Sequence, residues 1–415
     1  MARARRASTR ATRRSAREWA LRGILASIFL VFGYVAVAQS LGSAQKDAFA
    51  ARAYALAPWD GRIGAQWSAR LSDGNASPAD RVVADRLATE ALRRDATAVA
   101  AVSTLGIDAQ IRGDTAAARR LFVYADRLSR RDLRTRLWAI EDAVARGDIP
   151  GALRQYDIAL RTSKLASDLL FPVLAPASEQ PAVSRELVRT LTRRPPWSEG
   201  FLAYLASTAD RPEAMARLFI GLHRNGVVAS DRVGATAIER LIAGGHDDAA
   251  WALYATIRPG SQRDHSRDPT FSHYIDVPTL FDWSLSNDDS GLSASIGRNG
   301  TRGIADFAAP ASIGGVLLQQ RQLLPQGRYV IEGRSAGVEQ VQAARPYWTL
   351  ACADGRELGR VDVTNSSVSN GRFAGIVTVP AGGCRAQILR LIARPSDDVS
   401  GVSGQLLGVT LRPAA

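Results

Sequence analysis

The sequence of 415 residues predicts a multidomain α and β chain: an N-terminal transmembrane helix, an α-helical solenoid and a C-terminal antiparallel β-sandwich. Three observations predict this order. An uncharged apolar stretch follows an arginine-rich start, an alanine- and leucine-rich region repeats at a fixed spacing, and short β-branched runs between turn residues follow. The expected parts are a basic cytoplasmic leader at 1–18, the membrane helix at 19–41, the solenoid at 42–260, a linker at 261–269 and the sandwich at 270–415.

The membrane helix is predicted from the stretch Gly23–Ala38 and its flanks. No charged residue stands from Gly23 through Gln45, and these 23 residues would span about 35 Å as a helix, against a hydrocarbon core of about 30 Å. Trp19 suits the headgroup region. Eight arginines and one glutamate lie in the first 22 residues, so the positive-inside rule keeps the N-terminus in the cytoplasm. We therefore expect a single pass through a bacterial inner membrane, with the bulk of the chain in the periplasm.

A cleaved signal peptide is the alternative to an uncleaved anchor. The small-x-small sequence at 36–38 fits a cleavage site after Ala38. The long basic leader favours the anchor, and so do three bulky residues near the site, which are Phe29, Phe32 and Tyr34. Both interpretations place residues 40–415 on the same side of the membrane.

The charge pattern argues against a nucleic-acid partner. The formal net charge is +13, but the leader supplies much of it and the remainder is dispersed. A nucleic-acid surface would need a basic stripe with interleaved aromatic residues, and the sequence has none. Only Lys46 and Lys164 are lysines among 53 basic residues, which is typical of coding bias in a GC-rich bacterium.

Two segments that start at Ile111 and Ala145 align with an offset of 34 residues. The matched positions are Gly113 and Gly147, Ala118 and Ala152, Phe122 and Tyr156, and Ala125 and Ala159. This period and the small–aromatic–small order resemble the tetratricopeptide repeat, although the signature of its first helix is incomplete here. The resemblance implies that the glycines lie in turns between paired helices and that the other positions pack within and between repeats.

Five or six such helical pairs are expected between residues 44 and 260. A solenoid of this kind buries a continuous core between neighbouring repeats and offers an extended surface, which usually holds a protein or peptide. The alternative is a solenoid that binds nothing and only spaces the C-terminal domain from the membrane.

Ten strands are expected after the linker. They are Phe281–Leu285, Leu292–Ile296, Gly303–Phe307, Gly315–Gln322, Gly327–Ser335, Tyr347–Ala353, Leu358–Val363, Arg372–Val379, Ala386–Ala393 and Gln405–Leu411. The turn Pro325–Gly327 before a strand with Tyr329 resembles carbohydrate-binding modules and galactose-binding jelly rolls. That resemblance implies contact with polysaccharide.

Cys352 and Cys384 are the two cysteines, and each is expected at a strand end. In an oxidising periplasm they can form a disulfide. Two separate buried thiols and a metal pair are the alternatives, and the sequence places no histidine or third cysteine near them.

Sugar binding would need exposed aromatic side chains, for which the candidates are Trp283, Trp348, Tyr347 and Tyr274. Because successive strand residues point to opposite faces, one of Tyr347 and Trp348 is expected in the core. Trp283 shares a face with apolar neighbours, so core packing competes with ligand binding there as well.

The sequence predicts neither a catalytic motif nor a cofactor or metal site. His265 and His273 lie among aspartates and are expected to be solvated linker residues rather than metal ligands, and Asp288-Asp289 is expected in an exposed turn with calcium as the alternative. We expect a non-enzymatic scaffold, and the order of anchor, repeats and sandwich resembles accessory proteins of exopolysaccharide assembly. The competing hypothesis is a glycan-processing enzyme, which would need two carboxylates about 5–10 Å apart in a cleft.

Overall fold

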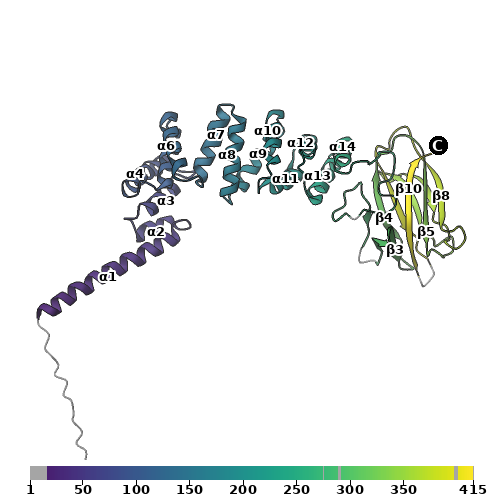
Figure 1. Ribbon diagram of the computed structural model, residues 1–415, viewed down its shortest axis with the longest axis horizontal. Coiled ribbons are helices and arrows are strands. Elements are labelled where there is room, and N and C mark those ends of the chain that lie inside the picture. The colour runs from purple at the N-terminus through teal and green to yellow at the C-terminus, as the bar shows by residue number, and fades with distance from the viewer. Residues whose placement is uncertain (1–15, 274, 288–290, 397–400, 415) are drawn as a thin grey trace, which may run out of the picture. The chain divides into compact units, whose positions relative to one another are not determined.

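The computed structural model describes residues 16–273, 275–287, 291–396 and 401–414. The chain divides into two compact units, of which the first ends at Lys164 and the second begins at Leu165. The first unit contains helices alone, and the second contains helices followed by two antiparallel sheets (Figure 1). The predicted fold class, which is a helical repeat region followed by a β-sandwich, is confirmed.

Eight helices form the described part of the first unit. They are α1 (Ala16–Gln45), α2 (Ala50–Leu56), α3 (Gly61–Leu71), α4 (Pro78–Arg94), α5 (Val99–Ile111), α6 (Thr115–Leu128), α7 (Leu133–Ala145) and α8 (Ile149–Thr162). Helix α3 packs on α4, α5 on α6, and α7 on α8, so consecutive helices form pairs. The C-terminal end of α1 pairs with α2 in the same way.

The turns inside two of these pairs are made by Gly-Asp dipeptides. Gly113 and Gly147 have φ angles of +83° and +70°, which an L side chain adopts only with strain. Each glycine ends one helix, and the following Asp114 or Asp148 accepts a backbone N–H as the cap of the next, with distances of 2.9 and 2.8 Å. The 34-residue repeat therefore marks a helix stop followed by a helix start.

The repeated small and aromatic positions are buried between these helices. They are Ala118, Phe122, Ala125, Ala152, Tyr156 and Ala159. The Phe122 ring stacks on Trp138 of α7 at 4.5 Å, which joins one helical pair to the next. A Cβ at Gly106 would lie 2.9 Å from the Phe122 ring, so glycine is needed opposite this aromatic residue.

The second unit begins with six helices. They are α9 (Ala166–Ala177), α10 (Pro181–Thr192), α11 (Ser198–Thr208), α12 (Pro212–Arg224), α13 (Asp231–Ala243) and α14 (Asp247–Ile257). Pro172 and Pro176 both lie inside α9. Pro181 stands at the start of α10, where its missing N–H removes no helical hydrogen bond.

Ten strands follow, and each overlaps an expected one. They are β1 (Ser284–Leu285), β2 (Ser293–Asn299), β3 (Arg302–Ala309), β4 (Gly315–Gln322), β5 (Gly327–Ala336), β6 (Tyr347–Cys352), β7 (Glu357–Asp362), β8 (Arg372–Val379), β9 (Gln387–Ala393) and β10 (Val402–Pro413). The sheets have the orders β1-β4-β9-β6-β7 and β2-β3-β10-β5-β8. Strand β1 is shorter than expected, because the Asp282 carboxylate accepts hydrogen bonds from the backbone and hydroxyl of Thr279 and closes a turn there.

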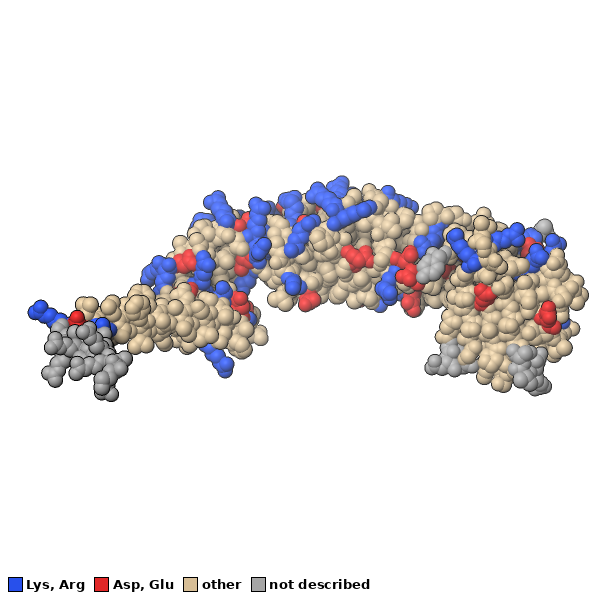
Figure 2. Space-filling view, turned by 60° about the horizontal axis from the view of Figure 1, so that its bottom comes forward, with Lys and Arg blue, Asp and Glu red and all other residues tan. Residues whose placement is uncertain are grey.

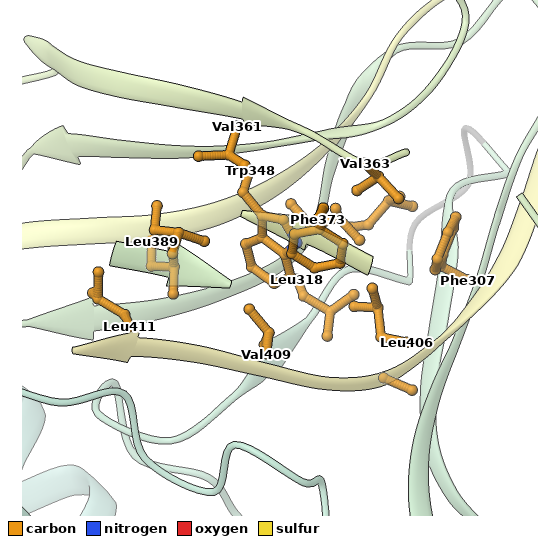
Figure 3. Close-up of a cluster of buried hydrophobic side chains, with 14 of the residues drawn as sticks. Phe307, Leu318, Trp348, Val361, Val363, Phe373, Leu389, Leu406, Val409 and Leu411 are labelled. Carbon is orange, nitrogen blue, oxygen red and sulfur yellow. The ribbon is translucent and has the colours of Figure 1, made fainter. Parts of the chain in front are cut away.

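The sandwich core lies between the two sheets (Figure 3). Trp348 of β6 and Phe373 of β8 face each other from opposite sheets, with Leu389, Leu406 and Val409 around them. Along β8 and β9 these residues alternate with more exposed ones, as strands with one buried face require, whereas β6 is buried on both faces from Trp348 to Cys352.

The segment 261–269, which was expected to be a linker, packs along the end of β10. The Ser266 backbone N–H donates to the Leu411 carbonyl, and the Leu411 N–H donates to the Ser266 hydroxyl, both at 2.9 Å. Ser266 and Arg267 are buried. This connection is therefore part of the sandwich surface rather than a solvated tether.

Candidate functional site

Helix α1 is long and apolar enough to cross a membrane, by length and composition. No other helix in the described ranges passes that test. Large apolar side chains cover its N-terminal two thirds and are exposed; Phe29, for example, is 73 % exposed and Leu30 is 74 % exposed. Figure 2 shows this part of α1 as a largely uncharged surface. Such a surface needs a lipid environment, which makes the helix a membrane anchor or a signal sequence.

The C-terminal third of the same helix packs against protein. Ala38 and Gly42 are buried, and a Cβ at Gly42 would lie 2.8 Å from the Ile63 side chain of α3. The Gln39 amide donates to the Asp60 carboxylate at 2.9 Å. Small residues at 38 and 42 thus let α2 and α3 approach closely, and the exposed apolar part of α1 continues without a break into the part that packs on the first helical pair. Sequence analysis found the apolar stretch but not this contact, for which the small residues one helical turn apart are the only signal.

An apolar stripe lies on α9 in the second unit. Leu165, Leu169 and Val173 follow one another at intervals of four residues and are 66 %, 50 % and 56 % exposed. Residues four apart share one face of a helix, so the three side chains are neighbours. A row of exposed apolar residues on a repeat helix is typical of a protein-contact surface.

Two aspartates meet between α4 and α5 in the first unit. Asp108 is 2 % exposed, and its Oδ1 accepts from the Ser72 hydroxyl at 3.2 Å and from Arg81 at 3.4 Å. Burial first, and then Asp85 within hydrogen-bonding reach, raise the pKa of Asp108 from 3.8 to about 6. Arg112 donates to Asp85 at 2.8 Å from the other side. Asp85, but not Asp108, is among the residues that line an open hollow of about 550 Å³ on α4.

The hollow beside this pair does not have the geometry that glycoside hydrolysis needs. The two carboxylates are in direct contact, whereas a glycosidase pair stands about 5–10 Å apart so that a sugar and a water molecule fit between them. The arrangement can share a proton between the aspartates but cannot hold a glycosidic bond between them.

Buried polar contacts join α14 to the sandwich. The Tyr254 hydroxyl donates to the Asp282 carboxylate at 2.8 Å. Arg267 donates to the Phe281 carbonyl at 3.0 Å and to Gln322, and its guanidinium lies 5.7 Å from the Trp251 ring centroid. Burial lowers the pKa of Arg267 to about 10 and raises that of Tyr254. Sequence analysis missed this contact, since Arg267 stands in a charged run that resembles a solvated linker.

A cavity of about 900 Å³ lies beside this contact. Its wall includes His265, His273 and Asp268. His273 pairs with Asp268 at 3.1 Å, and His265 pairs with Asp264 at 2.7 Å, so the two histidines have different carboxylate partners. Among the described residues no three histidine, cysteine or acidic side chains gather as metal ligands would. Tyr274, Asp288 and Asp289 lie outside the described residues.

The aromatic candidates for ligand binding occupy different environments. Trp348 is fully buried and Trp283 is 5 % exposed, and their ring centroids lie 5.8 Å apart inside the core. Trp348 cannot stack on a ligand outside the sandwich and is a core residue, whereas Trp283 packs in the core and also lines the cavity beside His265 and His273. Tyr347 is partly exposed on the outer face, with the Arg360 and Arg394 guanidiniums 4.1 and 4.6 Å from its ring centroid.

The predicted disulfide between Cys352 and Cys384 is present. It joins the end of β6 to the residues before β9, and these strands are neighbours in one sheet with a Cα–Cα distance of 5.4 Å between the cysteines. Both cysteines are therefore structural, and no free thiol remains in the chain.

No protein-family model and no curated protein matches the sequence. Solved structures are similar to parts of the chain, among them the following three. PilW, a widely conserved type IV pilus biogenesis factor, is 16 % identical over 49 % of this chain and 95 % of its own, with a TM-score of 0.26. The enzymatically active domain of tailspike protein 4 from bacteriophage CBA120 is 9 % identical over 32 % of this chain and 19 % of its own, with a TM-score of 0.24.

The third similar structure is the Glycosylation Associate Protein (Gap123) complex from Streptococcus agalactiae. It is 12 % identical over 31 % of this chain and 43 % of its own, with a TM-score of 0.21. The chain thus spans less than half the length of this protein and of the tailspike domain. Similarities at this level carry no argument about activity or partners.

Proposed function

We propose that this chain is a non-enzymatic scaffold, anchored in the inner membrane, whose helices hold a protein partner on the periplasmic side. Helix α1 is the observation that carries the proposal. Its exposed apolar part continues into the part that packs on α2 and α3, so one helix both spans the bilayer and packs against the first repeat helices. The basic residues before α1 favour a cytoplasmic N-terminus, and the disulfide suits an oxidising compartment.

The anchor is retained in this proposal rather than cleaved. Cleavage after Ala38 would cut within α1 and leave only residues 39–45 to pack on α2 and α3. Mass spectrometry of the mature protein tests this directly. We expect a chain that still contains α1, and a mature N-terminus at Gln39 would refute the anchor.

The protein partner binds the apolar stripe Leu165, Leu169 and Val173 in this proposal. A carboxylate placed in the middle of an apolar contact would remain unpaired when the partner covers it. Val173→Glu should therefore reduce the amount of partner that the full-length protein captures from crosslinked membranes. Val228→Glu is the matched control, since Val228 is 66 % exposed in the same unit but lies outside the stripe.

Three outcomes separate this proposal from its alternatives. Loss of one specific partner with Val173→Glu and not with Val228→Glu supports the stripe. Equal capture by both variants places the contact elsewhere on the helices. If the unmodified chain captures no partner, the helices act only as a spacer.

Contact of the sandwich with an envelope polysaccharide, as in exopolysaccharide assembly, is the second part of the proposal. Among the three described aromatic candidates, Tyr347 is the one that is not buried, and the guanidiniums of Arg360 and Arg394, each paired with a carboxylate, lie beside its ring. Affinity electrophoresis in gels that contain the polysaccharide measures this contact. Tyr347→Ala should migrate faster than the unmodified chain, and equal migration would remove Tyr347 from the site.

The proposal that the chain binds without catalysis has its own test. Asp85 lines a hollow and interacts with the buried Asp108, which makes the Asp85 carboxylate the one to examine. We expect the purified chain to leave envelope glycans intact. Glycan cleavage that Asp85→Asn abolishes would refute the non-enzymatic function.

A further inference from the structure

The turn between α2 and α3 lies where α1 leaves the apolar environment. We infer that this turn, with Trp59 at its tip, is a lipid-contacting surface that seats the first helical pair on the periplasmic leaflet. The inference rests on the proposed membrane anchor and adds a second contact with the same bilayer. Its occupant is the headgroup region of the membrane rather than a protein.

The length of α1 sets the position of this surface. Twenty residues separate Trp19 from Gln39, which is about 30 Å along a helix and equals the thickness of the hydrocarbon core. With Trp19 in the cytoplasmic headgroup region, Gln39 reaches the opposite boundary. The hydrogen bond from Gln39 to Asp60 then holds the α2–α3 turn at that boundary, because Asp60 is the residue after Trp59.

The direction of α2 independently places the α2–α3 turn at the same boundary of the bilayer. Helix α1 continues past Gln39 to Gln45, and the chain then turns at 46–49. Helix α2 runs back along α1, since Gly42 faces Ala53 and Ala57. The α2–α3 turn is therefore the end of this pair nearest the bilayer, and Phe49 lies at the far end.

The side chains at the turn suit a headgroup region. Trp59 is 41 % exposed and Arg62 is 68 % exposed, and an amphipathic indole ring favours the boundary between hydrocarbon and water. Arg62 pairs with Asp95 at 2.8 Å, and Arg94 pairs with Glu90. Because these charges are balanced, the indole ring rather than net positive charge supplies the attraction, and the contact should not need anionic lipid.

Photocrosslinking of the full-length protein in native membranes tests the inference. Benzoylphenylalanine replaces one exposed residue at a time: Trp59 at the turn, Phe29 within the exposed part of α1 as the positive control, and Val144 on α7 as the negative control. We expect phospholipid adducts at positions 29 and 59 with a yield several-fold above that at position 144. The adducts are identified by mass spectrometry.

Crosslinking at positions 29 and 59 separates failure of the inferred lipid contact at the turn from failure of the proposed membrane anchor. Adducts at position 29 but not at position 59 would overturn the inference and leave the anchor in place. A lack of adducts at both positions would refute the anchor itself. A protein adduct at position 59 in place of lipid would also overturn the inference, since the turn would then be a partner site.

Discussion

Replacement of Asp108 by asparagine should stabilise the first unit at neutral pH. Asparagine has the shape of the protonated carboxyl, and its amide can donate to Asp85 as the proton does. The pKa of Asp108 is raised from 3.8 to about 6 by burial and by Asp85, so the folded state holds this proton more tightly than the unfolded chain. Below pH 3.8 Asp108 is protonated in both the folded and the unfolded state, so its ionisation does not destabilise the fold.

The destabilisation by Asp108 appears as the pH rises above 3.8. Between 3.8 and about 6 the unfolded chain has lost the proton while the folded chain retains it, and the free energy of unfolding falls by about 1.4 kcal/mol per pH unit. Above pH 6 the loss levels at about 3 kcal/mol. We therefore expect Asp108→Asn to raise the free energy of unfolding by about 2–3 kcal/mol at pH 7.5 and by much less at pH 4.5.

Hydrogen exchange of the α5 amides, corrected for the intrinsic rate at each pH, measures this difference. Asp142→Asn is the matched control, because its pKa is lowered: burial opposes ionisation, but Arg119 and Arg146 outweigh it. That variant should lose stability at pH 7.5, with an effect that fades as the pH falls through the lowered pKa. A gain for Asp108→Asn that is equal at both pH values, or a loss at pH 7.5, would refute the reasoning.

Three further predictions concern packing. Removal of the disulfide by Cys352→Ala with Cys384→Ala should lower the free energy of unfolding of the sandwich by about 3–4 kcal/mol in urea, and an unchanged midpoint would contradict its structural role. Phe122→Ala should cost about 3–5 kcal/mol in the first unit by thermal unfolding, whereas the exposed Tyr124→Ala should cost far less. Tyr254→Phe removes one hydrogen-bond donor to the buried Asp282 carboxylate and should weaken the contact between α14 and the sandwich by about 1–3 kcal/mol. We expect faster proteolysis at 258–269 in this variant, and an unchanged rate of proteolysis would contradict the prediction.

The fold was predictable where a local pattern determines it. Gly113 with Asp114 and Gly147 with Asp148 specify a helix end and a helix start from neighbouring residues alone, and strands β4 and β8 have the bounds that alternation predicted. Turn chemistry and periodicity act over a few residues, which is why one sequence suffices to recognise them.

Apart from the disulfide, the contacts between distant segments were not predictable. Arg267 stands in a polar run, and its burial depends on Phe281 and Trp251, which other parts of the chain bring to it. The approach of Asp85 to Asp108 likewise depends on how α4 packs against α5. The burial of Trp348 is a further example. Alternation along the strand predicted that one of Tyr347 and Trp348 is buried, but only the packing of the two sheets determines which one.

The position of β10 has a consequence for the order in which the parts of the chain fold during synthesis. This strand, Val402–Pro413, is the central one of its sheet and pairs with β3 and β5, while its end also bonds the segment before Pro269. The helices can fold as soon as they are synthesised, whereas that sheet stays open until β10 has been made. The two cysteines emerge before β10, so the disulfide can form while the sandwich is still incomplete. Closure of the sandwich is then a late step that waits for the central strand β10.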